Sequence, residues 1–140
     1  MKKNITRIPA LVLVLVLLLS TTSYATQKAS YYLQYYDAYI TKSGNTIKVT
    51  FEVQGTSIMD AVGVTEIYLY ERETSLSSWV LVQTYLSTDS NYTDAMIGTN
   101  TGLKFGHVSY SGSSTKQYMA YVTCYAEKNG GSDSRDIIAD

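Results

Sequence analysis

The chain has 140 residues and a formal net charge of −1, with 11 Lys and Arg against 12 Asp and Glu. That length suits one compact domain and is too short for two domains of ordinary size. The absence of a basic excess disfavours a nucleic-acid-binding protein, which would need a strongly basic face.

The first 25 residues are typical of a Sec-type signal peptide. A basic start is followed by an unbroken run of Leu and Val over residues 11–19, and Ser23 and Ala25 place small side chains at positions −3 and −1 of a cleavage site. The apolar run is shorter than the roughly 20 residues that a membrane-spanning helix needs. We therefore predict a signal peptide at 1–25 and a single secreted domain at 26–140, with no membrane span after cleavage.

The predicted secreted domain is mildly acidic and has no disulfide. It carries 8 basic and 12 acidic side chains, a net charge of −4. Its last residues form neither an apolar tail nor a sorting motif, so we expect free secretion or loose, non-covalent association with a cell wall. Cys124 is the only cysteine, which leaves burial to stabilise the fold. Secreted proteins without disulfides are common in bacteria with a single membrane.

Alternating apolar and polar side chains predict β-strands from residue 31 onward. The clearest strand is 46–54, in which every second side chain is apolar and the others are polar. A strand with one solvated face is typical of an antiparallel sheet. Residues 31–41 are predicted to pair with it as a hairpin, with Tyr35 and Tyr39 facing outward.

A connecting loop is predicted at 55–63, followed by a strand at 64–72 with Tyr68 and Tyr70 facing outward. The charged residues at 71–73 are expected to discourage this strand from pairing edge to edge with another sheet. A polar turn then leads to a strand at 78–86.

The Thr-, Asn- and Gly-rich residues 87–102 are predicted to form a long connection, with at most a short strand at 95–97. Two strands follow at 104–110 and 117–127, and Tyr121 and Tyr125 share the outer face of the second. The Asn-Gly-Gly sequence at 129–131 indicates a hairpin turn before a closing strand at 132–138. No convincing helix is expected after residue 25.

About seven short strands separated by turn signals predict an all-β fold. The expected architecture is an antiparallel two-sheet sandwich of the immunoglobulin or fibronectin type III kind.

Two resemblances support that expectation. Tyr118, the alternating small apolar residues after it and the turn at 129–132 resemble the penultimate strand and last hairpin of fibronectin type III domains, in which a tyrosine marks the corner. The chain also resembles a family of small secreted proteins of unknown function from Gram-positive bacteria. The matching segments are 31–33, 47–51, 59–63, 78–79 and 117–135. The second resemblance implies location and fold and no activity.

Few side chains after residue 25 could carry catalysis. His107 is the only histidine, so a zinc site that needs several His or Cys ligands is not expected. Ser109 lies two residues further on, and no third group of a triad is apparent. We interpret His107 as an ordinary surface residue and Cys124 as a small buried hydrophobe, with a dimer disulfide or a reactive thiol as alternatives for Cys124.

The acidic residues do not form a convincing site either. Glu66 and Glu71 lie along one predicted strand and Glu73 lies in the turn after it, whereas the two acids of a glycosidase must face each other across a cleft. Asp133 and Asp136 lack the dense ligand loop of a calcium site. We therefore predict no catalytic residue, cofactor or metal.

Fourteen tyrosines, against two Phe and one Trp, form the compositional anomaly. Tyrosine combines apolar area with a polar tip and is enriched in interfaces. We predict an interaction surface formed by the outward tyrosines, which are Tyr35, Tyr39, Tyr68, Tyr70, Tyr121 and Tyr125. The alternative is that cross-strand tyrosine pairs only stabilise the sheet faces, by about 0.2–1 kcal/mol each. Trp79 is expected to pack in the core or against the sheet.

These observations favour a secreted, non-enzymatic binding module whose partner is an extracellular protein or a cell-wall carbohydrate. The alternatives from other classes are a small extracellular hydrolase or hydrolase inhibitor, and a secreted toxin-like effector.

Overall fold

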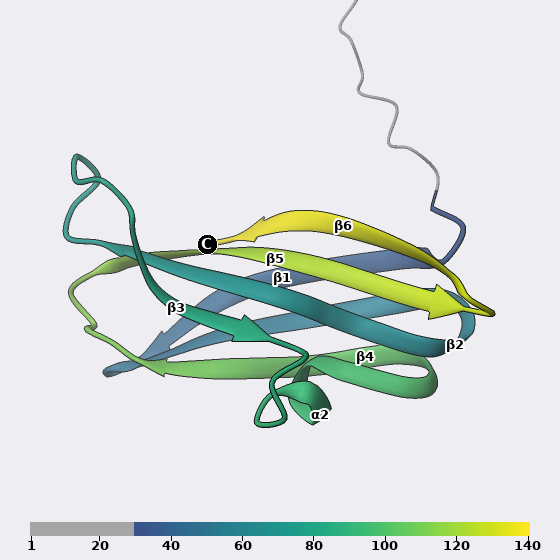
Figure 1. The fold of residues 1–140 in the computed structure, drawn as a ribbon. Coiled ribbons are helices and arrows are strands. Elements are labelled where there is room, and N and C mark those ends of the chain that lie inside the picture. Colours follow the sequence, from purple (N-terminus) through teal and green to yellow (C-terminus); the bar gives the residue numbers. More distant parts are fainter. Residues whose placement is uncertain (1–29) are drawn as a thin grey trace, which may run out of the picture.

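The computed structural model describes residues 30–140, so the predicted signal peptide at 1–25 lies outside the described residues. The described part is all-β and antiparallel, with one short helix (Figure 1). Its elements are β1 (Leu33–Ser43), β2 (Thr46–Arg72), β3 (Val80–Leu86), α2 (Thr93–Met96), β4 (Ile97–Ser111), β5 (Gln117–Lys128) and β6 (Gly131–Ala139). That helix is neither long nor apolar enough to cross a membrane.

The long strand β2 organises the fold. Residues 46–54 pair with β1 on one side and with β4 on the other. Residues 61–72 pair with β5 on one side, and on the other side residues 59–63 pair with the start of β4 and residues 66–71 with β3. Figure 1 shows these two halves running in opposite directions in two layers. We call them the β1 layer (β1, the first half of β2, and β4) and the β5 layer (β6, β5, the second half of β2, and β3).

The predicted loop at 55–63 is wrong, because β2 continues through it as a bend. Gln54 pairs with Leu103 and Met59 with Thr101, so four residues of β2 lie opposite a single residue of β4. Gly55 allows the tight bend, since a Cβ at this position would collide with the Met59 side chain. Polar residues and a glycine interrupt the alternation here, which is the pattern of a loop in sequence.

Residues 93–96 form a helical turn, and the short strand considered at 95–97 is absent. Thr93 Oγ1 donates to the Ser87 carbonyl at 2.7 Å, and the Thr93 amide donates to the Asp89 carbonyl at 3.0 Å. Such local bonds in a Ser-, Thr- and Asp-rich segment compete with strand pairing. β4 then begins at Ile97, seven residues before the predicted start of this strand.

The core lies between the two layers and consists of the predicted inward positions. Ile47, Val49, Phe51 and Val53 of β2 are at most 1% exposed. The opposing side chains, all fully buried, are Ile67, Leu69, Ala120, Val122, Cys124 and Ala126. The period-two alternation therefore predicted the buried face of the central strands correctly.

Polar contacts tie the layers together along both sides. Where β1 meets β6, the Asp133 carboxylate accepts hydrogen bonds from Ser30 Oγ at 2.6 Å and from the Tyr31 amide at 2.8 Å. Where β3 meets β4, the Tyr85 hydroxyl donates to the Ser109 carbonyl at 2.9 Å. Each contact joins the edge of one layer to the edge of the other.

Tyr118 fixes the corner between β4 and β5. Its ring is buried, and its hydroxyl accepts a hydrogen bond from the Ser113 amide at 2.7 Å and donates to the Ser113 carbonyl at 3.1 Å. One phenol therefore satisfies both backbone groups of a residue five positions upstream.

Candidate interaction surfaces

Four of the six tyrosines proposed from the sequence gather on the outer face of the β5 layer. Tyr68 of β2 lies directly opposite Tyr121 of β5. The rings of Tyr70 and Tyr121 meet edge to face, with centroids 5.7 Å apart. Tyr121 is 43% exposed, while Tyr68, Tyr70 and Tyr125 are half-buried.

Aliphatic side chains extend this aromatic group across all four strands of the layer. Tyr70 pairs with Leu81 of β3 and Met119 of β5, and Tyr121 pairs with Ile138 of β6. We define the tyrosine face as Tyr68, Tyr70, Leu81, Met119, Tyr121 and Ile138. Contiguous exposed apolar area of this kind is a common feature of interaction sites.

Neighbouring carboxylates hold two phenols of this layer in place. The Tyr68 hydroxyl donates to Glu66 at 3.0 Å, and the Tyr125 hydroxyl donates to Glu127 at 2.6 Å. These hydrogen bonds are the main reason that the pKa of each tyrosine is raised above its ordinary value. Both phenols therefore stay neutral, and their fixed orientation lowers the entropy that binding would cost.

Tyr35 and Tyr39 lie elsewhere, on the outer face of the β1 layer, where they are 46% and 45% exposed. The register places Gln54 and Leu103 beside Tyr35, and Thr50 and His107 beside Tyr39. The six tyrosines therefore occupy two separate faces. A partner that binds one face would therefore contact either the four tyrosines of the β5 layer or the two of the β1 layer.

The β1 layer also exposes Phe105, which was not singled out in the sequence although it alternates with His107 on one strand. Phe105 is 60% exposed and lies next to Glu52, which in turn lies opposite Asp37. The Asp37 charge is the largest cause of the raised pKa of Tyr35, followed by burial and the Glu52 charge. This face is aromatic and acidic, in contrast to the more aliphatic tyrosine face.

The two side chains with catalytic potential lie on different sides of the β1 layer. Cys124 points into the core from β5 and is fully buried, and that burial raises the pKa of its thiol to about 12. His107 is exposed on the outer face of β4. The structure therefore does not bring them together.

The acidic residues considered from the sequence are engaged in local contacts. Lys116 forms salt bridges with Glu71 at 2.7 Å and with Glu73 at 3.1 Å, and these hydrogen bonds raise the pKa of Lys116. Asp136 accepts a hydrogen bond from Thr123 at 2.8 Å. Within residues 30–140, no three His, Cys, Asp or Glu side chains are grouped closely enough to hold a metal ion.

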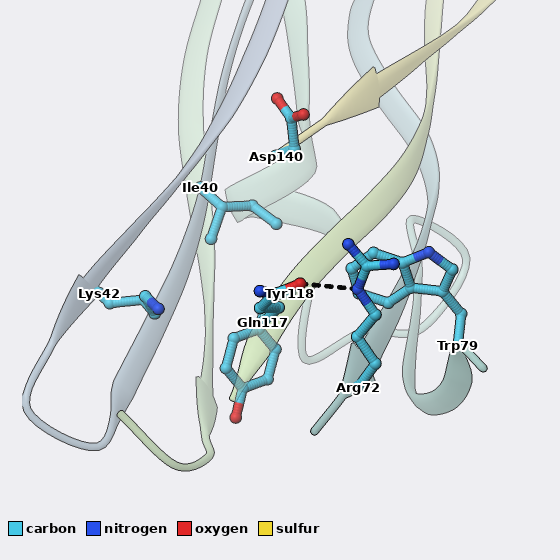
Figure 2. Close-up of a pocket in the computed structure, with 7 residues that line it drawn as sticks. All are labelled: Ile40, Lys42, Arg72, Trp79, Gln117, Tyr118 and Asp140. Atoms are coloured by element: carbon cyan, nitrogen blue, oxygen red, sulfur yellow. Dashed lines mark hydrogen bonds between the residues drawn. The ribbon is translucent and has the colours of Figure 1, made fainter. Parts of the chain in front are cut away.

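A pocket of about 360 Å³ opens between β1 and the start of β5 (Figure 2). Trp79 lines it and is partly exposed, so of the two expected placements the core is wrong, whereas packing against the sheet agrees with its contact with Arg72 of β2. The Arg72 guanidinium lies 4.2 Å from the Trp79 ring centroid and donates from Nε to Gln117 at 2.7 Å. Together with a hydrogen bond from Nη1 to the Ser75 carbonyl at 3.2 Å, these contacts hold the guanidinium against the indole.

Comparison of the chain with known proteins finds no matching family model, no similar curated protein and no similar solved structure. Any function is therefore argued from the residues and their arrangement.

Proposed function

We propose that residues 26–140 form a fibronectin type III-like sandwich. If the two halves of β2 are counted separately, the fold has seven strand segments, three in the β1 layer and four in the β5 layer. The hydrogen bonds from Tyr118 to the backbone of Ser113 support the assignment, because a tyrosine corner at the start of the penultimate strand is a hallmark of related sandwiches.

We also propose that the protein is secreted after cleavage behind Ala25, as a member of the small Gram-positive family that its sequence resembles. The layout of residues 1–25 supports export. Mass spectrometry of protein collected from the culture medium would test this, because the chain should begin at Thr26. An exported chain that retains residues 1–25 would contradict the proposal.

We infer that the protein is a non-enzymatic binding module that uses the tyrosine face to contact an extracellular protein or a cell-wall carbohydrate. The observation that carries this proposal is the contiguous aromatic and aliphatic patch spanning four strands. The separation of His107 from Cys124 is also more consistent with binding than with hydrolysis.

The test compares two tyrosines of nearly equal exposure on opposite layers. Tyr121→Ser removes a ring from the tyrosine face, whereas Tyr39→Ser removes one from the β1 layer. In a pull-down from culture supernatant and isolated cell wall, Tyr121→Ser should lose the captured partner and Tyr39→Ser should retain it. Unchanged capture by Tyr121→Ser, together with a loss of thermal stability, would instead favour a purely structural role for the tyrosine pairs.

A further inference from the structure

The four edge strands of the fold differ in how they are protected from pairing. β1 and β4 are the edges of the β1 layer. The β5 layer is bounded by β6 on one side and on the other by β3 and, along residues 59–63 of β2, by the start of β4. Natural sheets discourage edge-to-edge pairing with charged side chains. β1 carries Asp37 and Lys42, β4 carries Lys104, and β6 carries Asp133, Arg135 and Asp136.

β3 has no such protection, because its sequence, Val-Leu-Val-Gln-Thr-Tyr-Leu, contains no charged residue, proline or glycine. Within residues 30–140, β3 pairs with β2 alone, which leaves its other edge unpaired. Val80 is 59% exposed and Leu81 48% exposed. The charged residues at 71–73, expected to protect an edge, instead belong to the end of β2 and the turn after it, and β2 lies inside the layer between β3 and β5.

We propose that the free edge of β3 pairs with β3 of a second copy of this chain to form a reversible dimer. The two strands run antiparallel about a twofold axis, so that the β5 layers of two copies become one continuous sheet. This goes beyond the proposed binding function, because it requires no outside partner.

Charge favours a second copy at this edge over the other three. Residues 30–140 carry seven Lys and Arg against twelve Asp and Glu, so two copies repel each other through most of their surfaces. At β3 two identical uncharged strands meet, and like charges do not face each other. An antiparallel strand pair is also self-complementary, since each position of one copy meets its symmetry-related position on the other.

The geometry limits the assembly to two copies. Twofold pairing uses the free edge of β3 in both molecules, and the opposite edge of the layer, β6, carries charges that oppose further addition. β3 has only seven residues and a register shift opposite Leu69 and Tyr70. The interface is therefore small, and we expect a dimer that dissociates on dilution.

The experiment measures the association constant by sedimentation velocity across a range of concentrations. The protein is expressed from its full 140-residue sequence and purified. Leu81→Lys places a cation beside the pairing edge and should weaken association about tenfold or more, since like-charge contacts across an interface are costly. Phe105→Lys is the matched control, because Phe105 is an exposed apolar residue too, at 60% against 48% for Leu81, but pairs with the β1-layer half of β2.

Tyr121→Ser separates this proposal from the binding function. Tyr121 belongs to the tyrosine face and is two strands away from the free edge of β3, so this variant should still dimerise. Backbone amides of β3 should also exchange with deuterium more slowly at high protein concentration. A wild-type protein that remains monomeric at millimolar concentration would overturn the proposal, as would equal weakening by Leu81→Lys and Phe105→Lys, or loss of the dimer in Tyr121→Ser.

Discussion

The hydroxyl of Tyr118 offers a sharp test of how the β4–β5 corner is stabilised. Tyr118→Phe keeps the buried ring and removes the atom that bonds to both the amide and the carbonyl of Ser113. A typical intramolecular hydrogen bond contributes about 0.5–1.5 kcal/mol, so losing two predicts a loss of about 1–3 kcal/mol in the free energy of unfolding. Because Ser113 is only half-buried, water can form some of the hydrogen bonds that its amide and carbonyl lose. We therefore expect a loss in the lower half of this range.

Urea unfolding, monitored by fluorescence, would measure the change in the free energy of unfolding. The variant and the wild type should have the same transition slope, which excludes a change in the unfolded state. Tyr39→Phe is the matched control, because Tyr39 is exposed on an outer face and its hydroxyl makes no hydrogen bond within residues 30–140. The control should stay within about 0.5 kcal/mol of wild type. If Tyr118→Phe were as stable as Tyr39→Phe, the hydroxyl would not fix this corner.

Two further predictions concern titratable groups. The hydrogen bond from Ser30 is the main reason that the pKa of Asp133 is lowered, so its contribution to stability should be present at neutral pH and disappear as the pH falls through that lowered pKa. Asp133→Asn should therefore be less stable than wild type at pH 7, and urea unfolding curves of the two proteins should converge in strong acid; a gap independent of pH would contradict this. The buried Cys124 thiol, with its pKa near 12, should resist iodoacetamide at pH 8 in the folded protein and react after urea unfolding. Full labelling of the folded protein would show that the thiol is accessible.

The sequence predicted the parts of the fold that depend on local alternation. The inward positions of residues 46–54 and 117–127 are buried as expected, because a period of two directly reports which face of a strand is apolar. The bend at residues 55–58 was missed, since a strand that folds over carries the same glycine and polar residues as a loop. Only the pairing of the flanking residues with β4, about 40 residues further along the chain, distinguishes a bent strand from a loop.

The candidate surfaces were predictable in part. The outward positions of the tyrosines followed from alternation, but their division between two layers depends on which strands pair. The hydrogen bond from Arg72 to Gln117 joins residues 45 positions apart, so no local sequence pattern predicts it or the stacking of Arg72 on Trp79 that accompanies it. The unprotected edge of β3 was equally hidden, because the sequence does not state which strand is outermost.

The continuous course of β2 through both layers has a consequence for how the domain unfolds. A segment can open independently only when it owns most of its contacts. Here β2 runs through both layers, β4 pairs with both of its halves, and the buried side chains of the two layers form one core, so detaching either layer exposes the core side chains of the other. The domain should therefore melt as a single all-or-none unit, with no stable half-structure for proteases or other chains to capture.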